Sequence, residues 1–312
     1  MSADHPSPSD RARAFEDFRP LLFAIAYRIL GTVSDAEDAV QEAWLRWDAS
    51  ATRPASTKAY LAATVTRIAI DVLRSARVRR ESYVGTWLPE PLLSDPYDDP
   101  AHAAELADSL STAALLVLEQ LSPLERAVFI LRDVFGFDFA EIASAVDRSD
   151  AACRQLAVRA RRHMDEGRPR YDADRAERDA LADRFFDAVR DGDVTQLTEL
   201  LAADVRAIGD GGGKAPQFAN GATGADRVAR VLAWMFPALA SIGATIRPRP
   251  INGEPGAIVY DRDGRIINTF TVEVLDGQIR TIRFVLSPDK LAHLGPVADP
   301  WAIARTVRDA TR

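Results

Sequence analysis

The segment FDFAEIASAVDRSDAACRQLAVRARR, residues 137–162, decides the fold of the middle of this chain. Asp138, followed three residues later by Glu141, is a capping box that predicts the start of a short helix. A turn is predicted at Asp147, and Ser149 is a favourable N-cap for a second, arginine-rich helix. In a helix-turn-helix, the second helix enters the DNA major groove and places cations on phosphates. An ordinary surface pair of helices with a solvated basic end is the alternative for this segment taken alone.

A further capped helix is predicted directly before this segment. Ser122-Pro-Leu-Glu125 combines a capping box with a proline in the first helical turn. Gly136 favours the end of that helix. The predicted order is therefore a capped helix, a glycine break, a short helix, a turn and a basic helix.

The first eighty residues predict a separate helical block. Apolar residues from Phe15 to Ile29 repeat at helical spacing, and Gly31 ends that run. Ser34-Asp-Ala-Glu37 is another capping-box pattern, and the helix that it opens is strongly acidic on its exposed face. Because an acidic face repels a phosphate backbone, we expect it to dock on a basic protein surface.

A long helix, predicted from Lys58 to about Arg80, carries the opposite charge at its end. Its core stripe includes Leu61, Val65 and Ile68, and its last turns hold a cluster of arginines. Such a cluster suits phosphate contacts. Arginines in a last helical turn also complement the helix dipole and need no ligand, which is the alternative.

Three motifs in this order resemble the bacterial extracytoplasmic-function (ECF) sigma factors. They are DAEDAVQEAWLRW from residue 35, IAIDVLR from residue 68, and LSPLER from residue 121 with the helix-turn-helix behind it. The resemblance covers about residues 10–165. It implies a sigma-2 domain that reads the promoter −10 element and a sigma-4 domain that reads the −35 element. The implied partners are promoter DNA and core RNA polymerase, the latter through its β′ clamp helices and β flap.

The same resemblance assigns residues to these partners. Those that match the polymerase-binding segment are Asp35, Ala36, Glu37, Asp38 and Glu42. Those that match the −10 region are Lys58, Arg67, Arg74, Arg77, Arg79 and Arg80. Those that match the −35 region are Arg148, Ser149, Ala152, Arg154, Gln155, Arg159 and Arg162. Since Ala151, Ala152 and Cys153 are poor hydrogen-bond donors, base readout must rely on their polar neighbours and on DNA shape.

Length, charge and composition agree with an intracellular regulator. A chain of 312 residues is expected to hold two or three domains. Its net charge of −7 argues against a general DNA coat, so nucleic-acid contacts must come from local basic patches. With no evident signal peptide or membrane-spanning run, we expect a cytoplasmic protein without a membrane partner. No cofactor, metal site or catalytic residue is expected.

Cys153 is the single cysteine of the chain, which excludes an internal disulfide framework. It falls in the predicted DNA-reading helix, where a redox-sensing role is one interpretation. A small buried or interface thiol is the commoner one.

Residues 85–108 predict an acidic linker that contains several prolines. A solvated, partly extended tether is one interpretation. However, the motif WLPEP at residues 87–91 places Trp87 beside Leu88, and this pair is typical of anchors for a hydrophobic groove. We therefore favour a specific docking role for this part of the linker.

After about residue 174 the pattern changes to that of an α+β domain. Helical segments come first, and segments of period two follow at 244–251, 257–260, 266–275 and 278–286. Asp263-Gly264 and Asp276-Gly277 predict hairpin turns between them. We expect a curved antiparallel sheet wrapped on helices. This order of elements resembles the SnoaL-like, NTF2-like cone, whose concave sheet encloses a pocket.

Two motifs stand out in this domain. DGGGK at residues 210–214 offers backbone N–H groups that can cradle an anion, although it lacks the spacing of a P-loop. SPDKL at residues 287–291 follows the last strand. The chain has only three lysines, and Lys214 and Lys290 fall in these motifs, which favours a specific role over chance placement.

WLPEP, DGGGK and SPDKL together resemble the marks of one ECF subgroup, in which a SnoaL-like domain is fused to the sigma domains. The family pattern often has Asn where this chain has Ser287. The resemblance implies that the C-terminal domain replaces a separate anti-sigma factor and contacts the linker. The implied contact residues are Trp87, Leu88, Pro89, Glu90, Pro91, Asp210, Gly211, Gly212, Gly213, Lys214, Pro288, Asp289 and Lys290. We expect Lys214 to complement the charge of Glu90.

The expected domain division is sigma-2 at 1–84, the linker at 85–108, sigma-4 at 109–168, the SnoaL-like domain at 174–295 and a tail at 296–312. The expected function is a sigma factor that is modulated in cis by its C-terminal domain. Two alternatives for that domain stay open. Catalysis would need an acid/base pair in the pocket, and the domain's only histidine is His293. The other alternative is a pocket that senses an unknown small ligand.

Overall fold

The computed structural model describes residues 8–81, 83–97, 99–167, 175–216 and 221–311, without the side chains of residues 8–9, 76–81, 103–104 and 175. These residues form two compact units. The helical unit combines residues of 1–81 and 95–168, and the C-terminal unit combines residues of 82–94 and 169–312. The predicted linker is therefore divided, because its first part belongs to the C-terminal unit and its second part to the helical unit.

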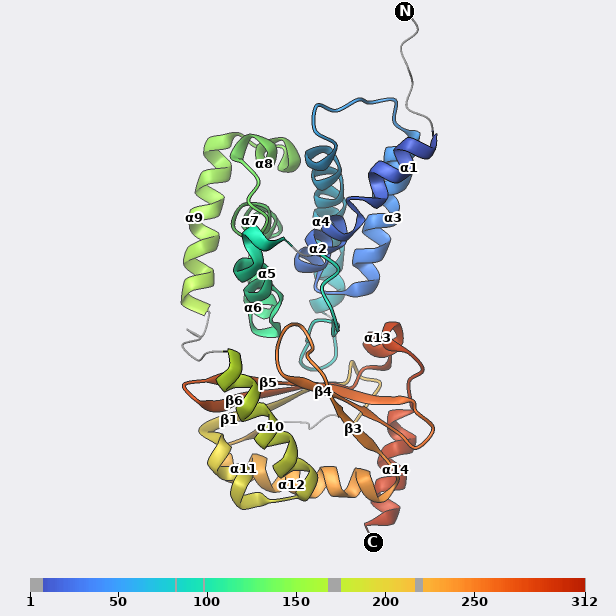
Figure 1. The fold of residues 1–312 in the computed structure, drawn as a ribbon, viewed down its shortest axis with the longest axis vertical. Helices are drawn as coiled ribbons and strands as arrows, with labels where there is room; N and C mark the ends of the chain where they lie inside the picture. Colours follow the sequence, from blue (N-terminus) through green and yellow to red (C-terminus); the bar gives the residue numbers. More distant parts are fainter. Residues whose placement is uncertain (1–7, 82, 98, 168–174, 217–220, 312) are drawn as a thin grey trace, which may run out of the picture. The chain divides into compact units, whose positions relative to one another are not determined.

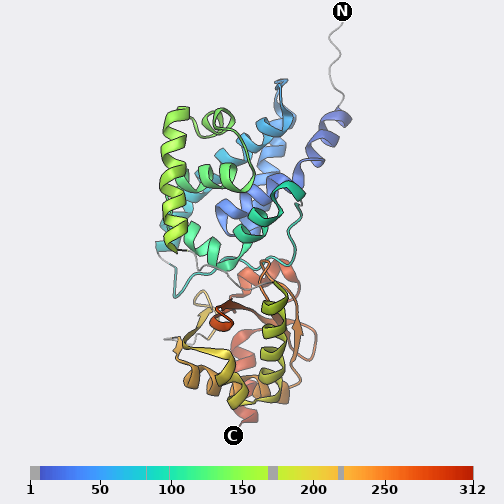
Figure 2. The ribbon, with the colours of Figure 1, turned by 60° about the vertical axis from the view of Figure 1, so that its left-hand side comes forward.

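The helical unit contains both blocks of helices that the sequence predicts (Figure 1). In Figures 1 and 2, the basic helix α9, light green, runs along one side of this unit. The elements are α1 (Pro8–Glu16), α2 (Arg19–Leu30), α3 (Val33–Ala49), α4 (Thr57–Glu81), η1 (Pro100–His102), α5 (Ala103–Leu110), α6 (Thr112–Leu118), α7 (Pro123–Phe129), η2 (Ile130–Val134), α8 (Phe139–Val146) and α9 (Asp150–Gly167).

Two of the three predicted capping boxes are confirmed. Ser122 and Glu125 cap α7 reciprocally, and Asp138 and Glu141 do the same for α8. The box predicted at Ser34 is wrong, because α3 already begins at Val33 with Thr32 as its N-cap residue. The hydroxyl of Thr32 instead donates to Asp35, at 2.7 Å.

The apolar run from Phe15 to Ile29 forms two helices and not one continuous helix. Proline has no N–H and is favoured in a first helical turn, and Pro20 lies in the first turn of α2. Gly31 ends α2 with a φ of 73°, as the sequence predicts. The buried faces of α2, α3 and α4 pack on one another and form the core of the first block.

The C-terminal unit is built on one mixed sheet in the strand order β2-β1-β6-β5-β4-β3. The predicted antiparallel meander is confirmed for β3 to β6, and β1 adds to β6 in parallel. The short β2 was not predicted, since two residues carry no periodicity. The strands are β1 (Leu201–Asp210), β2 (Ala222–Thr223), β3 (Thr245–Pro248), β4 (Gly256–Tyr260), β5 (Ile266–Leu275) and β6 (Gln278–Val285).

Helices cover one face of this sheet, among them α10 (Arg175–Asp191), α11 (Val194–Leu200) and α12 (Ala225–Ser241), as Figure 1 shows. The core lies between them and the strands. Phe270 of β5 is at its centre, with ring centroids of Phe186, Phe236 and Phe284 at 5.8, 5.4 and 5.3 Å. Aromatic pairs at these separations stabilise a core beyond the area that they bury.

The chain after β6 is helical and packs on the same unit. It forms α13 (Pro288–Leu291), η3 (Ala292–Leu294) and α14 (Pro300–Ala310). The side chain of Asp299 accepts from the N–H groups of Trp301 and Ala302 and so caps α14. Residues 300–310, which the sequence analysis assigned to a tail, thus form a capped helix that packs against α12.

Candidate functional site

Asp210, at the end of β1, binds the first part of the linker. Its side chain is fully buried. Oδ1 accepts from the Tyr83 hydroxyl at 2.6 Å and from the Gly212 N–H at 3.1 Å. Oδ2 accepts from the Leu88 N–H at 2.8 Å. Burial, and then the neighbouring Asp210 carboxylate, raise the pKa of Tyr83, so its hydroxyl stays protonated and donates.

Lys290 of α13, which follows the end of β6, completes this site. Its ammonium lies 2.6 Å from Asp210 Oδ2 and also donates to the backbone carbonyl of Leu88. The nitrogen lies 4.4 Å from the centroid of the Trp87 ring and 4.8 Å from that of Tyr83. One buried cation therefore joins a carboxylate, a linker carbonyl and two aromatic faces. We call Asp210 and Lys290 together the linker clamp.

The glycine loop after β1 allows the linker to come close. Gly212 and Gly213 have φ values of 56° and 73°, a region that favours glycine. A Cβ on Gly212 would lie 2.8 Å from the Tyr83 hydroxyl oxygen, and one on Gly213 would lie 3.3 Å from Val84 Cβ. The backbone carbonyl of Asp210 also accepts from Leu286 and Ser287, which fixes the ends of β1 and β6 together.

Further contacts hold the remainder of the linker segment. His293 Nε2 lies 2.8 Å from the carbonyl oxygen of Pro91, and its Nδ1 lies 3.9 Å from Glu90 Oε2. The Leu92 N–H donates to Asn252 Oδ1 at 3.1 Å, and the Asn252 N–H donates to the Leu92 carbonyl at 2.7 Å. Residues 88–91 are all buried. This part of the linker is thus a docked segment and not a solvated tether.

The structure brings most of the predicted linker and C-terminal motifs together, with one correction. Lys214 does not pair with Glu90, because its ammonium lies 2.6 Å from Asp289 on an exposed surface. The charges at the clamp are therefore arranged differently from the prediction, with the carboxylate in DGGGK and the cation in SPDKL. Sequence reasoning missed Tyr83, Asn252 and the linker contact of His293, although Asn252-Gly253 is a recognisable turn dipeptide.

The acidic face predicted to bind polymerase lies on α3. Glu37 and Asp38 are exposed, and Asp35 and Glu42 are half-buried. Glu37 pairs with Arg19 at 2.7 Å and Glu42 with Arg46 at 2.9 Å. Ala36 is fully buried among core residues, so its side chain cannot belong to a contact surface in this state. An alanine at this position of the helix faces inward with Val40, which is the reason for this correction.

Two of the predicted −10 residues contact the second helical block inside the helical unit. Arg67 donates to the backbone carbonyls of Ala145, at 3.0 Å, and of Ser144, at the end of α8. The Lys58 ammonium lies 5.4 Å from the centroid of the Phe137 ring. Arg74 is exposed and pairs with Asp71 at 3.4 Å. The side chains of Arg77, Arg79 and Arg80 lie outside the described residues.

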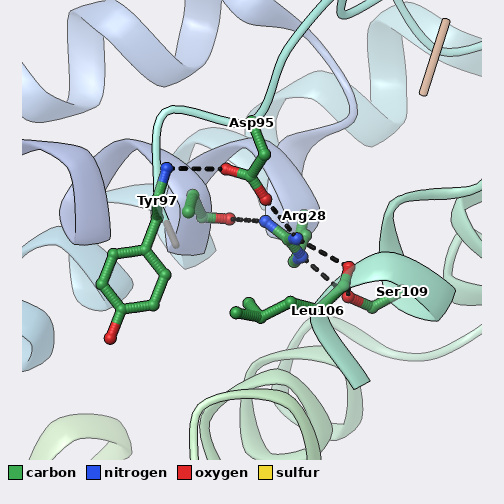
Figure 3. A network of polar contacts seen from close by, with 6 residues as sticks. Arg28, Asp95, Tyr97, Leu106 and Ser109 are labelled. Carbon is green, nitrogen blue, oxygen red and sulfur yellow. Dashed lines mark hydrogen bonds and ion pairs between the residues drawn. The ribbon is translucent and has the colours of Figure 1, made fainter. Parts of the chain in front are cut away.

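A buried arginine that the sequence analysis did not single out also joins the two blocks. Arg28 of α2 lies 2.6 Å from Asp95 and donates to Ser109 and to the carbonyl of Leu106, at 2.8 and 2.9 Å (Figure 3). Asp95 itself accepts from the Tyr97 N–H at 3.1 Å. Since an unpaired buried cation is costly, this network holds residues 95–109 on α2.

The predicted −35 residues lie on α9 and the turn before it. Ser149 accepts from the Ala152 N–H at 3.3 Å, which confirms it as an N-cap. Six of the seven predicted side chains are exposed, and Ala152 is half-buried. The Arg154 guanidinium lies 5.1 Å from the centroid of the Phe139 ring, and Arg159 pairs with Glu125 at 2.8 Å. Cys153 points inward and is fully buried.

Family models match all three parts of this geometry. Sigma-70 region 2 matches residues 14–79, Sigma-70 region 4 matches residues 111–164, and a SnoaL-like domain matches residues 182–285. The chain is 39% identical over 290 residues to ECF RNA polymerase sigma factor SigJ of Mycobacterium tuberculosis, covering 88% of this chain and 91% of SigJ. The chain belongs to the ECF sigma factors. Its role is therefore that of a sigma factor in transcription initiation.

Two further comparisons extend this result over nearly the whole sigma factor. This chain is 29% identical over 286 residues to the probable ECF sigma factor SigI of Mycobacterium tuberculosis, covering 90% of this chain and 94% of SigI. The crystal structure of SigJ matches with a TM-score of 0.70 at 35% identity, covering 92% of this chain and all of that one. The fused SnoaL-like domain is thus shared with a solved relative. None of the described helices of this sigma factor is long and apolar enough to cross a membrane.

Proposed function

We propose that this sigma factor is controlled in cis by its C-terminal domain, through the linker clamp. The observation that carries the proposal is the buried contact of Asp210 and Lys290 with the backbone of Leu88, together with the packing of Lys290 on Trp87. Hydrogen bonds to the backbone of a segment fix its conformation independently of its side chains. The clamp therefore acts on the length of free linker and not on DNA.

The length of free linker matters because the linker joins the two promoter-reading blocks. An extended segment of the size of residues 82–94 spans roughly 40 Å. When the clamp holds this segment, that reach is removed from the connection between α4 and the second helical block. The −10 and −35 elements lie at a fixed separation, so the state of the clamp changes how both can be reached together.

The contacts of Arg67 and Lys58 support a second part of the proposal. Both residues match the −10 region, and both are engaged by the second helical block. They cannot contact a melted DNA strand and these partners at once. We infer that the helical unit is in a closed state, and that binding to polymerase and promoter separates α8 from α4.

The partner surfaces follow from charge and exposure. The exposed acidic side chains of α3 suit the β′ clamp helices of core RNA polymerase, and the exposed polar side chains at the start of α9 suit the −35 element. Contacts to the β flap would also come from the second helical block. Acting on polymerase and promoter DNA, the protein would work in the cytoplasm.

A non-enzymatic role of the C-terminal domain is also part of this proposal. His293, the single histidine of this domain, contacts the linker at Pro91. The cavity of the domain is lined, among the described residues, by no acid/base pair. General acid–base catalysis needs such a group within reach of a substrate.

The experiment is in vitro transcription with core polymerase and the full chain, from a promoter identified by mapping transcript starts after overproduction. Lys290→Met and Asp210→Asn remove one side of the clamp each, and both are expected to change transcript yield in the same direction. Lys214→Ala is the matched control, because its pair with Asp289 is exposed and outside the clamp. Unchanged yield for both clamp variants would refute control through this contact.

A further inference from the structure

The C-terminal domain contains a cavity of about 420 Å³ between α12, α14 and the sheet. This volume lies in the range of small-molecule sites. Its walls are mostly apolar and include Trp234, Met235, Phe284 and Ile303. One wall is α14, a short helix whose outer side is exposed to solvent.

Asn268 of β5 is a polar side chain in this apolar wall. It is only 4% exposed, and its Oδ1 atom has no hydrogen-bond partner among the described residues. A buried amide without a partner is costly, and such groups are rare in folded proteins. At the neighbouring core position of the same strand, Phe270 packs in the aromatic cluster. A polar group bound in the cavity would supply the partner that this amide oxygen does not have.

We propose that this cavity binds a largely apolar, uncharged small molecule that carries a hydroxyl group, and that the hydroxyl pairs with Asn268. A hydroxyl can donate to the amide oxygen or accept from the amide nitrogen, so it satisfies either orientation of the side chain. Among the described residues, Arg308 is the one charged residue that lines the cavity, and it is exposed, so these residues offer no buried counter-charge to an ion. Apolar walls supply the affinity, and the amide of Asn268 supplies the selectivity.

This site is separate from the linker clamp, although the two are close along the chain. Phe284 and Leu286 line the cavity, whereas Asp210 and Lys290 do not. The inference therefore does not depend on control through the linker. A binding experiment can fail while the transcription experiment succeeds, and the reverse.

The test uses the full chain and two probes that differ by one hydroxyl, 2-naphthol and naphthalene, measured by equilibrium dialysis. Naphthalene is the more apolar probe, so a cavity without a polar partner would prefer it. We expect saturable binding of one 2-naphthol per chain, about tenfold tighter than naphthalene. Absence of saturable 2-naphthol binding up to about 1 mM would overturn the proposal.

Three variants assign the binding to this cavity. Asn268→Leu is expected to abolish the preference, by weakening 2-naphthol about tenfold without weakening naphthalene. Ala304→Trp fills the cavity from α14 and is expected to weaken both probes, whereas Arg305→Trp, on the exposed side of α14, weakens neither. Circular dichroism checks that each variant folds. If Ala304→Trp does not fold, the binding preference of Asn268→Leu alone decides whether the probes bind in this cavity. An unchanged preference in Asn268→Leu, or equal effects of the two tryptophan variants, would show that the probes bind elsewhere.

Discussion

The ammonium of Lys290 lies 2.6 Å from Asp210 Oδ2, with 7% of the lysine side chain and none of the aspartate side chain exposed. These residues come from SPDKL and DGGGK, and the segment that they hold contains WLPEP. A buried ion pair stabilises a fold only when its remaining hydrogen-bonding groups are satisfied. Here Tyr83, just before the linker, and Leu88 within it supply those partners, so the pair and the docked segment depend on each other.

The first prediction concerns the local stability of the docked linker. Lys290→Met leaves the Asp210 carboxylate buried without its cation, and removal of one partner of a buried pair costs about 3–5 kcal/mol. Hydrogen exchange of residues 83–94 should therefore accelerate by about two to four orders of magnitude. Lys214→Ala removes only an exposed pair and should change this exchange little. Equal exchange in both variants would contradict the assignment of the clamp.

The second prediction concerns the glycine loop. Gly212→Ala places a Cβ 2.8 Å from the Tyr83 hydroxyl oxygen at a φ of 56°, and we expect a cost of about 1–3 kcal/mol and faster exchange of the linker. Gly264→Ala is the control, since its φ is 78° but no atom lies within 4 Å of the added Cβ. It should lower the midpoint of urea unfolding slightly and leave linker exchange unchanged. The idea fails if both variants affect the linker equally.

The third prediction concerns polymerase binding. Charge reversal at Glu37 and Asp38, the two exposed acidic residues of this set on α3, should weaken binding to core polymerase in a pull-down while circular dichroism stays the same, because exposed charges add little stability. Asp48→Lys, near the exposed end of the same helix, serves as the matched control. Binding that is as tight in the double variant as in the intact chain would remove α3 from the interface.

The fourth prediction separates base reading from phosphate contact on α9. Arg154→Ala should weaken promoter binding by about 1–3 kcal/mol and relax the sequence preference. Arg162→Ala should instead reduce by about one the slope of the logarithm of the DNA-binding constant against the logarithm of salt concentration. Arg154 lies in the first turns of α9 and Arg162 further along, and both are exposed. Filter binding over a salt series, with promoter and scrambled duplexes, distinguishes the two. Identical, sequence-independent losses would show that α9 does not read bases.

The fifth prediction concerns Cys153, for which the sequence left a redox role open. The residue is fully buried, and burial raises the pKa of its thiol, so little thiolate is present at neutral pH. We expect no reaction with 5,5′-dithiobis(2-nitrobenzoic acid) in the native chain and one thiol released in urea. Rapid reaction of the native chain would restore the redox interpretation.

The sequence predicted the elements of this protein well, because their signals are local. Capping at Ser122 and Asp138, the stop at Gly31 and the hairpins at Gly264 and Gly277 each depend on a few neighbouring residues. It also identified the motifs of the linker clamp. It did not predict that Lys290, and not Lys214, would be the buried cation, because burial depends on residues about eighty positions apart.

The contacts between the two helical blocks had no sequence signal either. Arg67 uses backbone carbonyls of Ala145 and Ser144 as acceptors, and every residue type offers a carbonyl. Arg28 lies in a mostly apolar helix, and nothing in the sequence pattern indicates that its side chain is buried or which residues it contacts. Asn268 also had no signal of its own, since it is one of four buried polar residues in β5 and the sequence does not show which of them lies without a partner.

Locking the linker in place tests control through the clamp most directly. The Cβ that Gly213 would carry lies 3.3 Å from Val84 Cβ, close to the separation in a disulfide. The variant Val84→Cys, Gly213→Cys and Cys153→Ser can thus be compared oxidised and reduced in the same transcription assay. We predict that oxidation changes transcript yield about fivefold or more and that reduction reverses the change. Equal yield from the oxidised and reduced protein, with the disulfide fully formed, would contradict control of this sigma factor by its linker.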